Sequence, residues 1–217
     1  MQNKENFKLI LEQTLDSVKN SGERKTLLLH VCCAPCSSYV LEYLSAYFDI
    51  TVFFYNPNIS PKEEFSFREQ ELQRLLEEMP LSSAVKIIVS EYNSAEFDAI
   101  AAGMENLPEG GARCYRCYAL RLEESAKLAK EKGFDYFCTT LSISPYKNAE
   151  WLNALGREFA EKYGVEYLIS DFKKNNGYKR SCQLSEHYSL YRQDYCGCVY
   201  SKRDAEKRRA DKKSFTQ

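Results

Sequence analysis

Five short apolar segments recur along this chain, separated by longer segments with apolar residues at helical spacing. The short segments are rich in β-branched and aromatic residues and predict buried strands at 26–31, 50–56, 85–90, 134–140 and 165–170. The intervening segments predict helices at 37–47, 60–79, 94–102, 117–133 and 148–164. An N-terminal helix is also expected, with one apolar face formed by Phe7, Ile10, Leu11, Leu15 and Val18. This alternation predicts an α/β fold, in which a largely parallel sheet is flanked by helices on both faces.

The composition changes this picture only at the C-terminal end. The chain has 217 residues, of which 44% are hydrophobic and 28% charged, and this predicts one α/β catalytic domain over 1–201. Its net charge of −1 gives no argument for binding nucleic acid as a whole. The segment from Lys202 to Lys213, however, holds seven Lys or Arg against three Asp or Glu. It predicts a basic tail over 202–217 that is a solvated helix, with a nucleic-acid contact as the alternative.

The sequence shows no signal for export or for a membrane span. No segment approaches 18 consecutive apolar residues, and segment 1–20 lacks the apolar core and cleavage site of a signal peptide. We therefore expect a cytoplasmic protein. In that reducing compartment, nine cysteines indicate metal binding or catalysis rather than a set of disulfides.

Three of the cysteines, Cys32, Cys33 and Cys36, come directly after the first predicted strand, in "LLLHVCCAPCSSYV". In open α/β sheets, ligands bind outside the carboxyl ends of the strands, which is where this loop is expected to lie. A nucleotide-binding loop at this position would need glycines so that backbone N–H groups can approach phosphate, and this loop has none. The loop therefore indicates thiolate chemistry and argues against nucleotide binding.

A second group, Cys114 and Cys117, forms a C-x-x-C pair in "GARCYRCYALR" at the start of a predicted helix. This spacing lets both sulfurs face one ion, and a helix N-terminus favours the thiolate form. Four soft ligands from two segments fit a tetrahedral zinc or an iron–sulfur cluster, and the spacing only slightly favours the cluster.

The remaining cysteines divide into one pair and two single residues. Cys196 and Cys198 form a C-G-C pair that can ligate metal, form a readily reduced disulfide, or be two inert surface thiols. Cys138 lies within a predicted strand and is expected in the core, whereas Cys182 has no assigned role. Of the two histidines, His30 is expected as a hydrogen-bonded core residue and His187 as half exposed.

Taken together and in this order, the motifs resemble the iron–sulfur epoxyqueuosine reductases of the QueH type. The matching segments are "LLLHVCCAPCSSYVLEYL", "FFYNPNISPKEEFSFREQELQRL", "GARCYRCYALRLEESAKLAKEKGFDYFCTTLSISPYKN" and "DFKKNNGYKRSCQLSEHYSLYRQDYCGCVYS", which extend from residue 27 to residue 201. The resemblance implies a Rossmann-like fold of the HUP type with a metal-binding cysteine loop after the first strand. It also implies the last step of queuosine biosynthesis, the reduction of epoxyqueuosine to queuosine at the wobble position of tRNAs for Asp, Asn, His and Tyr.

The resemblance implies a role for most of the cysteines. Cys32, Cys33, Cys114 and Cys117 would hold a [4Fe–4S] cluster, and an additional iron ion beside it would be bound partly by Cys33 and Cys36. Some relatives have Asp at the position of Cys36. Cys196 and Cys198 would form a redox-active disulfide. Removal of an epoxide oxygen as water needs two electrons and two protons, so an external electron donor is also implied, which the motifs do not specify.

Two other classes of function share some of these features. A sulfur-transfer enzyme acting on tRNA would normally activate its target with ATP, and the glycine-rich phosphate loop for this is missing. A non-catalytic, zinc-stabilised RNA-binding module would explain the cysteines and the basic tail, but not the position of the first cysteine group at a strand end. For tRNA binding, the candidate contacts are the tail and the Tyr–Lys segments 144–148 and 175–181, interpreted as loops, for which solvated turns are the slightly favoured alternative.

Overall fold

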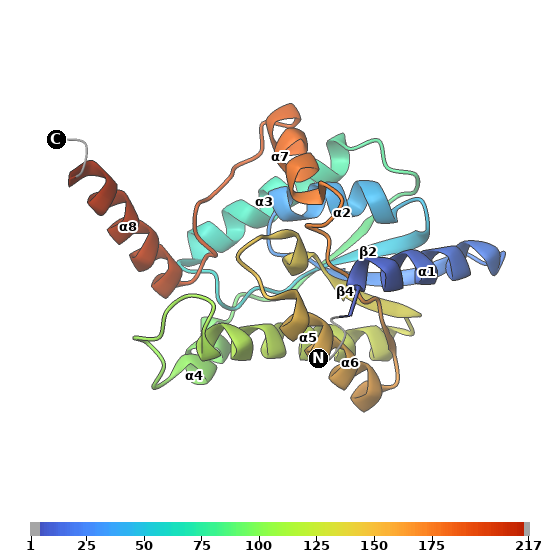
Figure 1. Cartoon of the computed structure of the whole chain (residues 1–217), viewed down its shortest axis with the longest axis horizontal. Helices are drawn as coiled ribbons and strands as arrows, with labels where there is room; N and C mark the ends of the chain where they lie inside the picture. Colours follow the sequence, from blue (N-terminus) through green and yellow to red (C-terminus); the bar gives the residue numbers. More distant parts are fainter. Residues whose placement is uncertain (1–4, 215–217) are drawn as a thin grey trace.

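A computed structural model describes residues 5–214 of the chain, with side chains up to residue 211. It contains one five-stranded sheet in the order β3-β2-β1-β4-β5, and all four strand pairs are parallel (Figure 1). The strands are β1 (Lys25–His30), β2 (Phe48–Phe54), β3 (Lys86–Val89), β4 (Tyr136–Thr139) and β5 (Glu166–Tyr167). The predicted parallel α/β architecture is therefore confirmed.

Helices cover both faces of this sheet (Figure 1). They are α1 (Phe7–Asn20), α2 (Ala34–Leu44), α3 (Lys62–Glu78), α4 (Ser94–Ala101), α5 (Ala112–Lys132), α6 (Ala149–Tyr163), α7 (Gly177–His187) and α8 (Val199–Ser214), with a 3-10 helix η1 (Thr140–Ile143). In the part of the chain that the structure describes, none of these helices is both long and apolar enough to cross a membrane.

The side chains of β1 explain the layers. Leu27 and Leu29 are fully buried in one core cluster, together with residues of α1, α2 and α3, whereas Leu28 is buried in a second cluster with residues of α5 and α6. Successive residues of a strand point to opposite faces, so an unbroken apolar strand requires helices on both sides. The chain order reverses between β1 and β4, its neighbour in the sheet. The carboxyl ends of these two strands form the crevice where open α/β sheets bind ligands.

Two helices begin earlier than predicted. Helix α2 starts at Ala34 and not at residue 37, with Cys33 as its N-cap, and α5 starts at Ala112 and not at residue 117. Neither N-cap makes a side-chain hydrogen bond, because the caps are a cysteine and Gly111 in place of the usual Ser, Thr, Asp or Asn. Cys36, Cys114 and Cys117 therefore lie on the first two turns of helices, and Cys32 and Cys33 directly precede such a turn, which fixes their directions.

The last strand is shorter than predicted, and the segment after it is held by a side chain. Strand β5 spans only two residues of the predicted 165–170. Beyond it, the buried Asn153 side chain accepts a hydrogen bond from Ser170 N and donates one to Ser170 O, at 3.0 Å each. These bonds satisfy the backbone groups that a neighbouring strand would otherwise pair.

The C-terminal part differs from its prediction at one position. Segment 175–181 is only partly a loop, because α7 begins at Gly177, where a Cβ would lie 2.0 Å from the carbonyl oxygen of Phe172. The basic tail is helical over 202–214, as predicted, and belongs to α8, which begins before residue 202, whereas residues 215–217 lie outside the described part of the chain. The division into a domain over 1–201 and a tail remains a prediction.

Candidate metal centre

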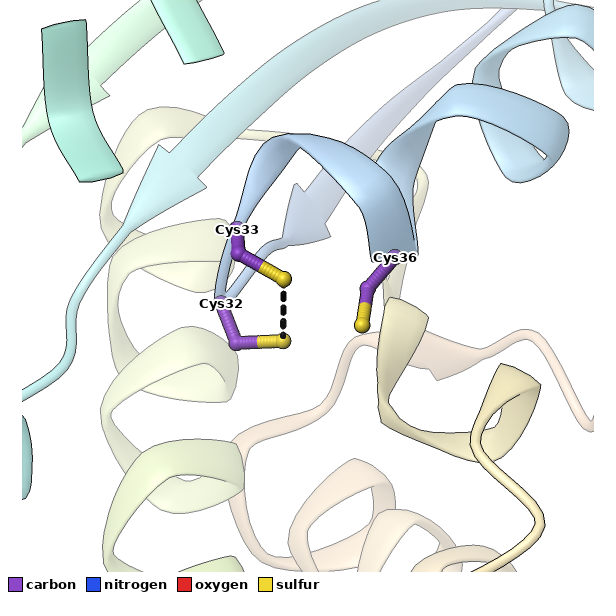
Figure 2. Close-up of side chains that lie close together, drawn as sticks. All are labelled: Cys32, Cys33 and Cys36. Atoms are coloured by element: carbon purple, nitrogen blue, oxygen red, sulfur yellow. Dashed lines mark hydrogen bonds between the residues drawn. The ribbon is translucent and has the colours of Figure 1, made fainter. Parts of the chain in front are cut away.

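The first cysteine group forms a compact cluster of sulfurs at the carboxyl end of β1. The Sγ atoms of Cys32, Cys33 and Cys36 lie within 4.8 Å of one another, and those of Cys32 and Cys33 are 3.8 Å apart. Figure 2 shows Cys32 and Cys33 on the turn between β1 and α2, with their sulfurs directed toward the side on which Cys36 of α2 lies. Three soft ligands at this separation can bind one metal ion or one edge of a cluster.

The three thiols share their protons unequally. Hydrogen bonds from Cys32 and Cys36 lower the pKa of the Cys33 thiol well below its usual range, and the charge of Arg68 lowers it further. Hydrogen bonds to Cys32 and Cys33 raise the pKa of Cys36 well above its usual range. The arrangement therefore favours the thiolate form at Cys33, which is 2% exposed, and a thiolate is the form that ligates metal.

The second cysteine group lies on the first turns of α5. Cys114 and Cys117 are three positions apart, so they share one face of the helix. The Sγ of Cys114 accepts a hydrogen bond from Gly110 N at 3.3 Å. Burial raises the pKa of Cys114 and raises that of Cys117 to about 12. A metal ion would have to displace a proton from each of these thiols, which couples metal binding to proton release.

The third group, Cys196 and Cys198, precedes α8. All nine cysteines lie in the described part of the chain and all are free thiols, so the predicted disulfide between these two is not present. Gly197 between them has φ 124° and could not carry a side chain without strain. Its carbonyl oxygen accepts from Ser60 N at 3.0 Å, and that of Cys196 accepts from Arg68 Nη1 at 3.0 Å. These bonds attach the C-G-C segment to α3 and to the loop before it.

Two adjoining cavities join the three groups. The larger, of about 600 Å³, is lined by all three cysteines of the first group. The smaller, of about 10 Å³, is lined by Cys114, Cys117 and Cys198. Three residues line both cavities: Cys196, Lys147 and Glu109. The second group is not part of the compact cluster of sulfurs, but the structure places it directly behind this shared wall.

The shared wall carries a buried ion pair. Lys147 is only 8% exposed, and its Nζ lies 3.2 Å from Oε1 of Glu109. Burial alone lowers the pKa of Lys147, but the neighbouring Cys196, Tyr118 and Glu109 outweigh this and raise it well above its usual range. Lys147 therefore stays protonated beside Cys196, and it is no longer a candidate for an exposed phosphate contact.

The charges around the cysteines fit an anionic metal group. Arg68 and Arg121 are each 1% exposed, and their positive charges interact with Cys33 and with Cys32 and Cys117, respectively. Buried charges require compensation, and metal-bound thiolates provide it. The donor set of soft thiols from two segments thus fits zinc or an iron–sulfur cluster.

The mouth of the larger cavity combines tyrosines with arginines. Tyr146 is 78% exposed there, and Tyr178 also lines the cavity. The basic residues are Arg192, whose guanidinium lies 5.8 Å from the Tyr178 ring centroid, and Arg208 and Arg209 of α8. Arg209 forms an ion pair with Asp194, which attaches the basic helix to the loop before it.

The cysteines and histidines outside the centre agree with the prediction in part. Cys138 is fully buried, and its Sγ donates to Leu168 O at 3.2 Å. His30 is fully buried and hydrogen-bonded, as predicted, whereas His187 is exposed rather than half exposed. Cys182 is half-buried on α7, outside all three groups.

Sequence reasoning missed the buried charged residues of the centre. Arg121 had a detectable signal, because it follows Cys117 by four positions and so lies on the same face of the helix. Arg68 and Glu109 had none, because their neighbours in the centre are distant in sequence.

Known proteins with similar sequences can be compared with this geometry. The sequence model of the family "Epoxyqueuosine reductase QueH" matches residues 27–204. The chain is 43% identical over 198 residues to the epoxyqueuosine reductase QueH of Streptococcus pyogenes serotype M1, covering 90% of this chain and 78% of that protein. It is 43% identical over 200 residues to the protein of the same name from Staphylococcus epidermidis, with 90% and 84% covered.

A more distant relative shows the same agreement. The epoxyqueuosine reductase QueH of Thermotoga maritima is 35% identical over 179 residues, covering 81% of this chain and 90% of that protein. All three cysteine groups lie within the residues that the family model matches. On this evidence, the chain belongs to the epoxyqueuosine reductase QueH family.

Proposed function

We propose that this oxidoreductase reduces epoxyqueuosine to queuosine at the wobble position of tRNAs for Asp, Asn, His and Tyr, with a [4Fe–4S] cluster and an adjacent iron ion. One observation carries the proposal. Cysteines from three separate segments meet around two cavities with a common wall, at the carboxyl edge of a parallel sheet. This is the edge where α/β enzymes keep their reactive groups.

In this proposal the cluster is bound by Cys32, Cys33, Cys114 and Cys117. The additional iron ion takes some of its ligands from Cys33 and Cys36. The compact first group and the thiolate at Cys33 support the ligand assignment. When bound, the cluster supplies electrons and the iron supplies an electrophile for the epoxide oxygen. The strand order β3-β2-β1-β4-β5 supports a Rossmann-like fold of the HUP type.

Cys196 and Cys198 are proposed as the redox-active pair. An epoxide becomes an alkene and water when it takes up two electrons and two protons. A dithiol that closes to a disulfide releases two electrons and two protons, so the two half-reactions balance. Cys196 lines both cavities, which gives the pair access to the substrate side and to the second cysteine group.

The remaining residues of the wall bind and orient. The Lys147 ammonium, held by Glu109, supplies a positive charge at the wall between the cavities, which would stabilise an oxygen that becomes negative as its bond to carbon breaks. A cytoplasmic location belongs to the same proposal, because thiols that bind metal are kept reduced in that compartment.

The rim of the larger cavity is proposed to bind the anticodon of tRNA. Exposed tyrosines can stack on unpaired bases, and arginines attract phosphates. Replacing Tyr146 with Ala is expected to raise KM for the tRNA by about 5- to 150-fold, as base–aromatic stacking contributes about 1–3 kcal/mol, and to leave kcat nearly unchanged. Steady-state kinetics on tRNA bearing epoxyqueuosine test this. The exposed Phe67, which does not line the cavity, gives the control F67A. An unchanged KM in Y146A would contradict the assignment of the rim.

The decisive test of the proposed function is the metal content of protein purified without oxygen. We expect about four acid-labile sulfides and four or five irons per chain, where an iron beyond four indicates the adjacent ion. Conversion of epoxyqueuosine to queuosine in tRNA is measured on the same sample. About one zinc with no sulfide would overturn the proposal and favour a zinc-stabilised RNA-binding protein.

A further inference from the structure

Arg121 is a buried cation without a carboxylate partner, and its side chain lies within hydrogen-bonding reach of the Cys117 sulfur. Its Nη2 donates to Asn56 Oδ1 at 2.6 Å and its Nε donates to His30 Nε2 at 3.2 Å. Both partners are neutral, because burial lowers the pKa of His30 to about 3. The third nitrogen, Nη1, has no hydrogen-bond partner. A guanidinium buried in this way is unfavourable unless a negative charge lies nearby.

The other two buried arginines have conventional partners. Arg68 forms an ion pair with Glu64 at 2.8 Å. Arg113, also on α5, donates from Nη1 to the backbone carbonyls of Met104 and Leu107, at 2.8 and 2.7 Å. Among the described arginines that are 1% exposed, Arg121 alone has neither a carboxylate nor a backbone carbonyl as a partner. The charge of Arg121 is therefore not compensated by the kind of partner that the other two buried arginines have.

The hydrogen bonds of Arg121 connect the two cysteine groups. Arg121 lies one turn beyond Cys117 on α5. Asn56, which it contacts, donates from Nδ2 to the carbonyl oxygen of Val31 at 2.9 Å, directly before Cys32. The other contact, His30, is the last residue of β1. The guanidinium thus lies between the helix that carries one pair of cysteines and the strand end that carries the other.

We propose that Arg121 is a positioning residue for the thiolate-bound cluster: it fixes the two cysteine pairs relative to each other, and its charge makes the cluster easier to reduce. The inference rests on the proposed function, because it assumes that the cluster is present.

Electrostatics gives the direction of the effect. The ionisable groups that interact most with Arg121 are the thiols of Cys117, Cys32 and Cys196, which are negative when they ligate metal. Burial alone lowers the pKa of Arg121, but these sulfurs outweigh it, so the guanidinium stays protonated. Reduction adds one electron from a reductant in solution, with no bond formed or broken, and Arg121 keeps its proton. A fixed positive charge in a low-dielectric interior stabilises the product, which has one more negative charge.

The test is the reduction potential of the cluster in the intact, iron-loaded protein, measured by a spectroscopic titration with iron and sulfide determined in parallel. R121Q removes the charge and keeps a hydrogen-bonding side chain, whereas R121K keeps the charge. N56D leaves Arg121 in place and sets a carboxylate beside it. R116Q, at an exposed position on the same helix, is the matched control.

We expect R121Q and N56D to shift the reduction equilibrium toward the oxidised form by about tenfold or more, which is 59 mV for one electron. The reduction potentials of R121K and R116Q should stay closer to the wild-type value than those of R121Q and N56D. An R121Q variant with full iron and sulfide and the wild-type potential would overturn the inference and leave the proposed function intact. If R121Q does not fold, N56D decides by the same criterion. Wild-type protein without sulfide would instead overturn the proposed function, and this inference with it.

Discussion

Replacing Cys114 with Ala is expected to abolish iron binding and epoxyqueuosine reduction together. The substitution removes one of four proposed ligands, and α5 has no further cysteine that could replace it, because its other thiol, Cys117, is already a proposed ligand. Loss of even an outer partner of a metal ligand typically costs 10–100-fold, so we expect activity to fall by more than about 100-fold. Iron and sulfide content, measured with turnover on the same sample, test this.

The control for this experiment is C182S. Cys182 is a half-buried thiol on α7 that lies outside all three groups, so its loss should change neither iron content nor turnover. Because Cys114 is half-buried and its sulfur accepts a single weak hydrogen bond, from Gly110 N, the Ala variant should still fold. Far-UV circular dichroism checks this. A folded C114A variant with wild-type iron and turnover would show that the C-x-x-C pair is not a ligand pair.

The sequence predicted the sheet well because its signal is local. Each buried strand is an apolar run that must be covered on both faces, and β1 shows this directly with three consecutive leucines buried in two different clusters. The strand at 165–170 was predicted too long because its pairing is replaced by the side chain of Asn153, from a different element. The early starts of α2 and α5 were missed because Cys33 and Gly111 cap them without the usual side-chain bond.

The cysteine groups were also predictable, because each is a short spacing motif. Their arrangement around two cavities was not, since it depends on how α5 and the segment before α8 pack against the end of β1. The position of Lys147 illustrates this limit. Its neighbours in sequence suggested an exposed loop, but the contact with Glu109 places it inside the wall between the cavities. The spacing of Arg121 from Cys117 can be read from the sequence, but its lack of a carboxylate partner cannot, because this depends on residues that are distant in sequence.

The C-G-C pair leads to a prediction of a different kind, in which iron is kept and turnover is lost. C196S and C198S should each retain the iron and sulfide of the wild type, because neither residue is among the proposed ligands. In C198S the serine hydroxyl can replace the contacts that the Cys198 sulfur makes with Ser201, at 3.3 Å. Each variant should nevertheless lose more than about 100-fold in kcat, as expected for groups that act as one unit.

The double variant tells a redox pair from two separate roles. A disulfide needs both sulfurs, so after the first substitution the second has nothing left to remove, and the double variant should lose no more than either single one. If the thiols acted independently, for example with Cys196 binding substrate and Cys198 supporting α8, the two losses would multiply. Multiplying losses, or a single variant with wild-type kcat, would contradict the redox-active pair. Because iron and sulfide are measured on the same samples, this failure would leave the ligand assignment of Cys32, Cys33, Cys114 and Cys117 standing.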